Sequence, residues 1–185
     1  LGPNAFHGFD YLGVGCKARK MSVYIDDLIL MDAINGDEIT RIALGDKFRN
    51  RFKNPYAVVH RGDLHGVFLN ACKENNLIEM CTNTNIIAYE QNTDGVFAIS
   101  DDGNKINGIA LIGAEGLWSK IRAQLVGDGP PKVSGHTTYR SVIPIDQMPE
   151  ELRWNAATLW AGPKCHIVHY PIHGGKSFNL VVTYH

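Results

Sequence analysis

Three short segments of the chain carry residue types that could bind an anion or act on a phenol. The first begins at His60 and continues Arg61-Gly62-Asp63, at the junction of an expected strand and an expected helix. A guanidinium beside the N-terminus of a helix adds a fixed positive charge to the positive end of the helix dipole, which suits phosphate. By spacing alone, Arg61 is equally well explained as a solvated residue that caps local structure.

A second segment, residues 112–122, combines glycines with polar residues at the start of a helix. Gly113 and Gly116 let the backbone approach a ligand closely. Ser119 and Arg122 lie three residues apart, so they share one face of the helix that follows. Taken alone, this spacing indicates only that the segment could hold an anionic group.

A third segment places an imidazole and a phenol on one strand. His166 and Tyr170 are four residues apart with Val168 between them, so all three face the same side of an extended chain. Either polar group could hydrogen-bond a phenolic substrate or move its proton. The alternative is that both are half-buried residues satisfied within the sheet. His166 and His169 point to opposite faces, so these histidines, with His173, do not predict a metal site.

The hydrophobic pattern predicts the elements that hold these segments. A first helix is expected from Asn4, as its N-cap, to Gly13, with Phe6, Phe9 and Leu12 on its buried face. Residues 13–18 match the dinucleotide pattern G-x-G-x-x-A, but a helix precedes them and strands follow, which is the wrong context. We then expect strands at 23–25, 28–31 and 38–42, a basic loop at 49–51, a strand at 57–60 and a helix at 64–71.

The remaining residues divide between an α/β element and a set of strands. An antiparallel pair is expected at residues 86–89 and 96–99. The apolar run 109–112 is typical of a strand buried on both faces, and residues 118–125 are expected to form the helix after it. Further strands at 137–143, 157–160, 166–170 and 178–184 look like a sheet of their own. The expected fold class is therefore a mixed α/β fold.

Composition and charge exclude several functional classes. The 185 residues are 44% hydrophobic, which is enough for a sizeable core. With 18 basic and 19 acidic residues the formal net charge is -1, so nucleic acid is not an expected partner. No apolar run reaches the roughly 20 residues of a membrane span. The four scattered cysteines fit reduced, buried thiols, and the chain is expected in the cytoplasm.

Taken together, these segments resemble the group A FAD-dependent aromatic hydroxylases. The segment from Val59 to Leu64 resembles the family's H-R-x-D-L sequence, and residues 113–122 resemble its motif G-A-D-G-x-x-S-x-x-R. Residues 134–171 are most similar to 3-hydroxybenzoate 6-hydroxylases. The resemblance implies that Arg61 contacts FAD. It also implies contacts to the flavin pyrophosphate or the nicotinamide cofactor from Gly113, Glu115, Gly116, Ser119 and Arg122.

One position departs from the family motif. Glu115 stands where the family has aspartate, and its extra methylene keeps the charge but moves it by roughly one C–C bond length. In such enzymes a histidine and a tyrosine of the third segment face the substrate ring, so the resemblance implies catalytic roles for His166 and Tyr170. The implied reaction uses FAD, NADH or NADPH, and oxygen to convert 3-hydroxybenzoate to 2,5-dihydroxybenzoate.

The resemblance also implies a domain organisation. Residues 1–130 would form part of a Rossmann-like FAD-binding domain with inserted antiparallel strands, and residues 131–185 would begin an antiparallel β-sheet substrate domain. Both ends of the sequence are abrupt, so we expect an internal segment that lacks the family's G-x-G-x-x-G unit and its later G-D segment. Such a segment is expected to hold flavin incompletely and to be inactive alone, with a homodimer of the full-length parent left open. The alternatives are a salicylate or 6-hydroxynicotinate hydroxylase, and a non-catalytic α/β module that binds a small molecule.

Overall fold

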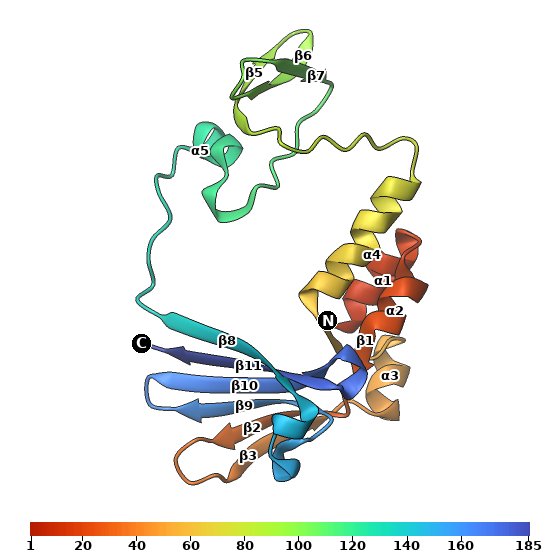
Figure 1. The fold of residues 1–185 in the computed structure, drawn as a ribbon, viewed down its shortest axis with the longest axis vertical. Helices are drawn as coiled ribbons and strands as arrows, with labels where there is room; N and C mark the ends of the chain where they lie inside the picture. Colours follow the sequence, from red (N-terminus) through yellow and green to blue (C-terminus); the bar gives the residue numbers. More distant parts are fainter. The chain divides into compact units, whose positions relative to one another are not determined.

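The computed structural model describes all 185 residues, which form five α-helices and eleven β-strands (Figure 1). The chain folds into two compact units. Unit 1 comprises Leu1–Ile78 and Gly135–His185, and unit 2 comprises Glu79–Ser134. The expected mixed α/β class is confirmed, and each unit is described by itself below. The predicted division into two domains at residue 130 stays a prediction.

Unit 1 is built on a six-stranded sheet with the strand order β3-β2-β9-β10-β11-β8 (Figure 1). Its strands are β2 (Asp27–Asp32), β3 (Glu38–Ala43), β8 (Thr137–Pro144), β9 (Ala156–Gly162), β10 (Cys165–Ile172) and β11 (Ser177–Tyr184). Neighbours are antiparallel except β2 and β9, which run parallel. The four C-terminal strands are confirmed. The prediction that they form a sheet of their own is wrong, because β2 and β3 pair onto the edge that β9 would otherwise leave open.

Both faces of this sheet carry buried side chains. On one face, Leu28, Ala157 and Tyr170 pack against a cluster formed by Ile25, Leu44 and Val58. On the opposite face, a second cluster joins Ile29, Met31 and Ala156 with Trp154 and Trp160. Since full burial of a side chain of this size contributes about 1.5–3 kcal/mol, the two clusters fix the sheet on both sides.

Four helices and a two-stranded ribbon complete unit 1. The helices are α1 (Pro3–Tyr11), α2 (Gly15–Met21), α3 (Asp46–Phe52) and α4 (Arg61–Glu74). The strand β1 (Ser22–Tyr24) pairs antiparallel with β4 (Ala57–Val59), and β4 leads directly into α4. The predicted strand and helix on either side of Arg61 are therefore confirmed.

Several details of the N-terminal region differ from the sequence-based expectation. The N-cap of α1 is Gly2 with Pro3 at the first position, rather than Asn4, because proline is preorganised for the first turn. Phe6 is fully buried, whereas Leu12 lies beyond the helix and is 62% exposed. Residues 15–21 form α2, so a helix rather than a strand follows the G-x-G-x-x-A pattern. The expected basic loop at 49–51 lies within α3, where Phe48 and Phe52 stack on one side.

Unit 2 contains a three-stranded meander and a short helix. Its elements are β5 (Ile86–Asn92), β6 (Gly95–Ser100), β7 (Lys105–Gly108) and α5 (Lys120–Val126). The side chain of Gln124 accepts from the Tyr89 amide at 2.9 Å and donates to its carbonyl at 2.7 Å, which fastens α5 to β5. The predicted antiparallel pair and the helix are confirmed, but the predicted strand at 109–112 is wrong. Ile109 and Ile112 are exposed, because a strand buried on both faces needs strands to pair with and none pairs here.

Two further features concern the lengths of the helices and the exposure of the cysteines. None of the helices is both long enough and apolar enough to cross a membrane. All four cysteines are free thiols, but the prediction that they are buried is wrong: Cys16, Cys81 and Cys165 are exposed and Cys72 is half-buried. Three of the cysteines therefore lie on the surface, where core packing does not constrain which residue is present.

Candidate substrate and cofactor sites

The candidate substrate residues lie in the middle of the six-stranded sheet. His166, Val168 and Tyr170 belong to β10, which has β9 on one side and β11 on the other. All three are half-buried. On an extended strand, His166 and Tyr170 are about 13 Å apart at their backbones, from four residues at roughly 3.3 Å each. That separation leaves room for one aromatic ring over Val168, with a polar group at either end.

Strand alternation separates His166 from His169, as predicted. His169 is only 2% exposed and points to the opposite face, between Trp154, Trp160 and Phe178. Neither ring nitrogen of His169 has a hydrogen-bond partner, and burial lowers the pKa of this imidazole. His169 is therefore a neutral core residue, while His166 is the histidine of β10 that remains accessible on the other face.

The register of the sheet adds a polar neighbour that sequence reasoning missed. Tyr170 pairs with Asn179 of β11, so the two side chains lie on the same face. The Asn179 Nδ2 atom is buried and makes no hydrogen bond. A buried donor without a partner is costly, and nothing within the sheet satisfies this one. No local pattern in the sequence could have found Asn179, because its relation to Tyr170 depends on the pairing register.

Arg61 is placed as the sequence predicted, at the first position of α4. Its side chain is exposed and forms no ion pair, and the preceding His60 makes no side-chain cap to the helix. The guanidinium thus has no carboxylate partner and no side chain caps the amides of the first turn, although Asp63 also lies in that turn. This donor set fits an anionic group such as the pyrophosphate of a dinucleotide.

The residues of the Gly113–Arg122 segment contact one another at the start of α5. The Glu115 carboxylate accepts from Ser119 Oγ at 2.7 Å and from the Ile121 amide at 3.3 Å, and the hydrogen bond from Ser119 lowers the pKa of Glu115. Ser119 Oγ in turn accepts from the Arg122 amide at 3.0 Å, as the N-cap. A negative charge of the chain itself therefore occupies the N-terminus of α5, so this end of the helix does not by itself present an anion site.

The two glycines of this segment occupy their positions for different structural reasons. A Cβ on Gly113 would lie 2.9 Å from Glu115 Oε2 and 3.1 Å from the Ile121 Cβ, so a larger residue would require both side chains to shift. Gly116 has a φ of +80°, a backbone conformation that other residues adopt only with strain. The arrangement explains both glycines without a ligand.

An open depression of about 650 Å³ lies beside this turn in unit 2. Its lining includes Gly116, Ser119 and Arg122, three of the predicted cofactor residues, together with Trp118 and Pro131. Arg122 is engaged in an ion pair with Asp128, whose pKa is lowered by that hydrogen bond. The depression offers a surface for a ligand, but its cation is already neutralised by a neighbouring carboxylate.

The structure thus brings together two groups of predicted residues. His166 and Tyr170 share one face of β10 in unit 1, and Glu115, Ser119 and Arg122 share the start of α5 in unit 2. Arg61 lies in unit 1, apart in the chain from the second group. The roles of all eight predicted site residues stay predictions, with Arg61 and the β10 pair the better supported by their surroundings.

Comparisons with known proteins identify relatives of this arrangement. No family model matches the chain. It is 54% identical over 183 residues to 3-hydroxybenzoate 6-hydroxylase 1 of Aquipseudomonas alcaligenes, covering 99% of this chain and 46% of that protein. It is 49% identical over 185 residues to a 3-hydroxybenzoate 6-hydroxylase of Polaromonas naphthalenivorans, covering 100% of this chain and 46% of that protein. The chain spans about half the length of the curated relatives it matches.

A solved structure supports the same relationship at the level of the fold. Klebsiella pneumoniae HpxO, crystallised with FAD and uric acid, superimposes with a TM-score of 0.83 at 20% identity, over 99% of this chain and 46% of that one. Similarity at this identity concerns the fold alone. Over its whole length the chain is therefore homologous to part of the 3-hydroxybenzoate 6-hydroxylases, and it shares the fold of the corresponding part of HpxO.

Proposed function

We propose that the protein to which this chain belongs is an FAD-dependent monooxygenase that hydroxylates 3-hydroxybenzoate to 2,5-dihydroxybenzoate. One oxygen atom of O₂ enters the ring and the other leaves as water, with two electrons supplied by NADH or NADPH. FAD supplies the oxygen activation in such a reaction, and that chemistry is the cofactor's own. The observation that carries the proposal is the pair His166 and Tyr170, both half-buried on one face of β10, in a chain 54% identical to such an enzyme.

The two polar groups of β10 have different roles in this proposal. A neutral imidazole can accept a proton near neutral pH, so Nε2 of His166 receives the proton of the substrate phenol. The Tyr170 hydroxyl donates a hydrogen bond that orients the ring over Val168. Loss of the phenol proton raises the electron density at the para carbon, which is the position to be hydroxylated. The orphaned Nδ2 of Asn179 supports a polar contact on the same face.

Cofactor binding is assigned to Arg61 first, because its guanidinium has no carboxylate partner and no side chain caps the first turn of α4. A second contact to the cofactor is assigned to Gly113, Gly116, Ser119 and Arg122. In this contact, some of the hydrogen bonds that close the turn of unit 2 are replaced by hydrogen bonds to the cofactor. Glu115 is the weakest of these assignments, since its carboxylate already accepts two hydrogen bonds. The protein is proposed to be cytoplasmic, in keeping with four free thiols.

Turnover of the full-length protein tests the substrate assignment. The rate of NADH or NADPH oxidation is measured with 3-hydroxybenzoate, salicylate and 6-hydroxynicotinate, and the product is identified by chromatography. We expect 3-hydroxybenzoate to stimulate oxidation most and to yield 2,5-dihydroxybenzoate. Stimulation by salicylate or 6-hydroxynicotinate alone would replace the substrate while keeping the enzyme class. Absence of FAD from the reconstituted protein would favour a non-catalytic binding module.

Substitutions on β10 test the site. Tyr170→Phe keeps the ring that packs on Ile25 and Val58 but removes the hydroxyl, so hydroxylation should fall by roughly 10–100-fold while FAD binding is retained. Tyr139→Phe is the matched control, because Tyr139 faces the other side of the sheet and stacks on Tyr184. His166→Gln keeps a hydrogen-bonding group that cannot take a proton, and it should be at least as damaging. Unchanged turnover in Tyr170→Phe would remove this residue from the site.

Titration of the apoprotein with FAD tests Arg61 separately from turnover. Arg61→Ala should weaken FAD binding by about 10–100-fold, as expected for loss of a charge-assisted hydrogen bond. Lys73→Ala is the control, since Lys73 is an exposed cation in the last turn of the same helix. An equal loss in both variants would indicate a general effect of charge rather than a contact from Arg61.

A further inference from the structure

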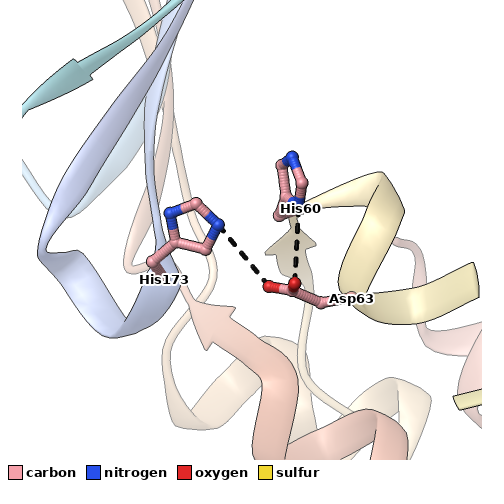
Figure 2. A group of neighbouring side chains, drawn as sticks. All are labelled: His60, Asp63 and His173. Carbon is pink, nitrogen blue, oxygen red and sulfur yellow. Dashed lines mark hydrogen bonds and ion pairs between the residues drawn. The ribbon is translucent and has the colours of Figure 1, made fainter. Parts of the chain in front are cut away.

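Three side chains that are far apart in the sequence converge in unit 1. His60 precedes α4, Asp63 lies in its first turn, and His173 begins the short turn between β10 and β11 (Figure 2). His60 Nδ1 lies 3.4 Å from Asp63 Oδ1, and His173 Nε2 lies 3.6 Å from Asp63 Oδ2. One ligand atom from each residue lies within 4.8 Å of the others.

The local backbone is shaped to bring the two imidazoles together. A Cβ on Gly62 would lie 2.9 Å from the His60 Cε1 atom, so the missing side chain at this position makes room for the His60 ring. His173 adopts a φ of +52°, in the left-handed region that costs a non-glycine residue roughly 1 kcal/mol or more. The two rings end with their centroids 4.7 Å apart. Strain of this kind persists where the surroundings, or a ligand, fix the conformation.

The distances within the cluster match those between neighbouring ligands of a metal ion. The contact from His60 Nδ1 to Asp63 Oδ1, at 3.4 Å, is a long hydrogen bond, and that from His173 Nε2 to Asp63 Oδ2, at 3.6 Å, is longer than the usual range of about 2.7–3.2 Å. Zinc binds imidazole nitrogen and carboxylate oxygen at about 2.0–2.2 Å, so two ligands of a tetrahedral ion are about 3.4 Å apart. Each contact to Asp63 therefore has the spacing of neighbouring ligands around an ion, with His60 beside Oδ1 and His173 beside Oδ2. The two imidazole nitrogens, which lie within 4.8 Å of each other, need to approach by at most roughly 1.4 Å.

The composition of the cluster fits a particular class of ion. Two imidazoles and one carboxylate suit Zn²⁺ and the neighbouring divalent transition metals better than Ca²⁺ or Mg²⁺, which prefer oxygen ligands. The three side chains remain 40%, 35% and 36% exposed, so water can complete the coordination. Three protein ligands with an open fourth position are a common arrangement for zinc.

We propose that His60, Asp63 and His173 bind a divalent transition-metal ion of the zinc class. The ion ties the start of α4 to the turn that follows β10. These elements carry Arg61 and Tyr170, so the ion stabilises the frame around both residues. The proposal does not rest on the hydroxylase function. It departs from the sequence-based expectation, in which His173 was considered only with His166 and His169.

Metal titration of the full-length protein, freed of any affinity tag and treated with a chelator, tests the proposal. Co²⁺ is added first because its ligand-field absorption reports nitrogen and oxygen ligands, and Zn²⁺ is then added as a competitor. We expect one ion to bind per chain and Zn²⁺ to displace it. At saturating Zn²⁺ the midpoint of thermal unfolding should rise by roughly 5 °C, because an ion that binds only the folded state stabilises it.

Variants locate the site. Asp63→Asn and His173→Gly should weaken Co²⁺ binding by at least about 10–100-fold, as loss of one of three ligands does. Glycine accepts the backbone conformation of His173 without strain, so that variant should fold. His65→Ala is the control, since this exposed histidine lies on the same helix outside the cluster and should leave binding unchanged.

Three results would overturn the proposal. One is no Co²⁺ or Zn²⁺ binding below about 1 mM, the weak end of specific affinities. Another is equal binding by the wild type and His173→Gly, which would place the ion at other residues. A third is a fall in the unfolding midpoint of metal-free Asp63→Asn and His173→Gly without any response of the wild type to metal. That outcome would make the cluster a hydrogen-bonded link between α4 and the turn.

Discussion

Replacing His169 by phenylalanine should stabilise the protein, and the gain should grow in acid. The imidazole is 2% exposed, and neither Nδ1 nor Nε2 has a hydrogen-bond partner. A buried polar group without a partner costs about 1–3 kcal/mol. Phenylalanine removes both polar atoms and keeps an aromatic ring against Trp154, Trp160 and Phe178, whose centroids are 6.0–6.4 Å away. Its larger ring costs part of the gain, so we expect a net increase of about 1 kcal/mol near pH 8.

The pH dependence follows from the direction of the pKa shift. Burial lowers the pKa of His169 below its unfolded value of 6.5, so the unfolded chain binds the proton more tightly. Above pH 6.5 the titration of His169 therefore does not change the free energy of unfolding of the wild type. Below pH 6.5 this free energy decreases as the pH falls toward the folded pKa. Uptake of one proton on unfolding changes the free energy of unfolding by at most about 1.4 kcal/mol per pH unit. The advantage of His169→Phe should consequently widen as the pH falls below 6.5 toward the folded pKa of His169.

Urea unfolding at several pH values measures both effects, with tryptophan fluorescence as the signal because Trp154 and Trp160 lie beside the substituted ring. His65→Ala is the control, since an exposed histidine should leave the slope of stability against pH unchanged. If the difference in the free energy of unfolding between His169→Phe and the wild type is the same at every pH, then His169 does not take up a proton on unfolding. A loss of more than about 2 kcal/mol at every pH would show that the imidazole nitrogens have partners after all.

Three further substitutions test the packing and the turn of unit 2. Phe6→Ala should lower the free energy of unfolding by about 3–5 kcal/mol in urea titrations, because Phe6 is fully buried against neighbouring aromatic rings; a loss below about 1 kcal/mol would contradict its place in the core. Gly113→Ala should speed amide hydrogen exchange in α5, since its Cβ would lie 3.1 Å from the Ile121 Cβ, and unchanged exchange would argue against a closed turn. Ser119→Ala should destabilise α5 by about 1 kcal/mol through loss of the cap to the Arg122 amide, whereas Ser119→Thr should retain most of it in the same exchange experiment.

Much of the candidate substrate site could be predicted because it depends on a local rule. Side chains alternate along a strand, so the spacing of His166 and Tyr170 fixed their common face, and that of His169 fixed its opposite one. The position of Arg61 at the start of a helix was equally local, since a short apolar strand and an amphipathic helix meet there. Local patterns suffice where the geometry repeats every two residues or every turn.

The errors arose where a pattern depends on distant partners. The apolar run 109–112 has the composition of a buried strand, but composition cannot supply the neighbouring strands that such a strand requires. The helix α3 replaced an expected loop because Arg49 and Arg51 are good helix formers and Phe48 packs against the core cluster. The sequence also gave no indication that β2 would pair with β9, more than a hundred residues later in the chain.

By itself, the sequence determined the fold class, most of the strands and helices, and the family resemblance, because these follow from hydrophobic periodicity and short motifs. The tertiary structure decided which side chains meet. It paired Asn179 with Tyr170 through the register of β10 and β11, and it brought His173 to His60 and Asp63 through the turn after β10. Such contacts depend on strand register and on the packing of elements remote in the chain, which no local spacing encodes.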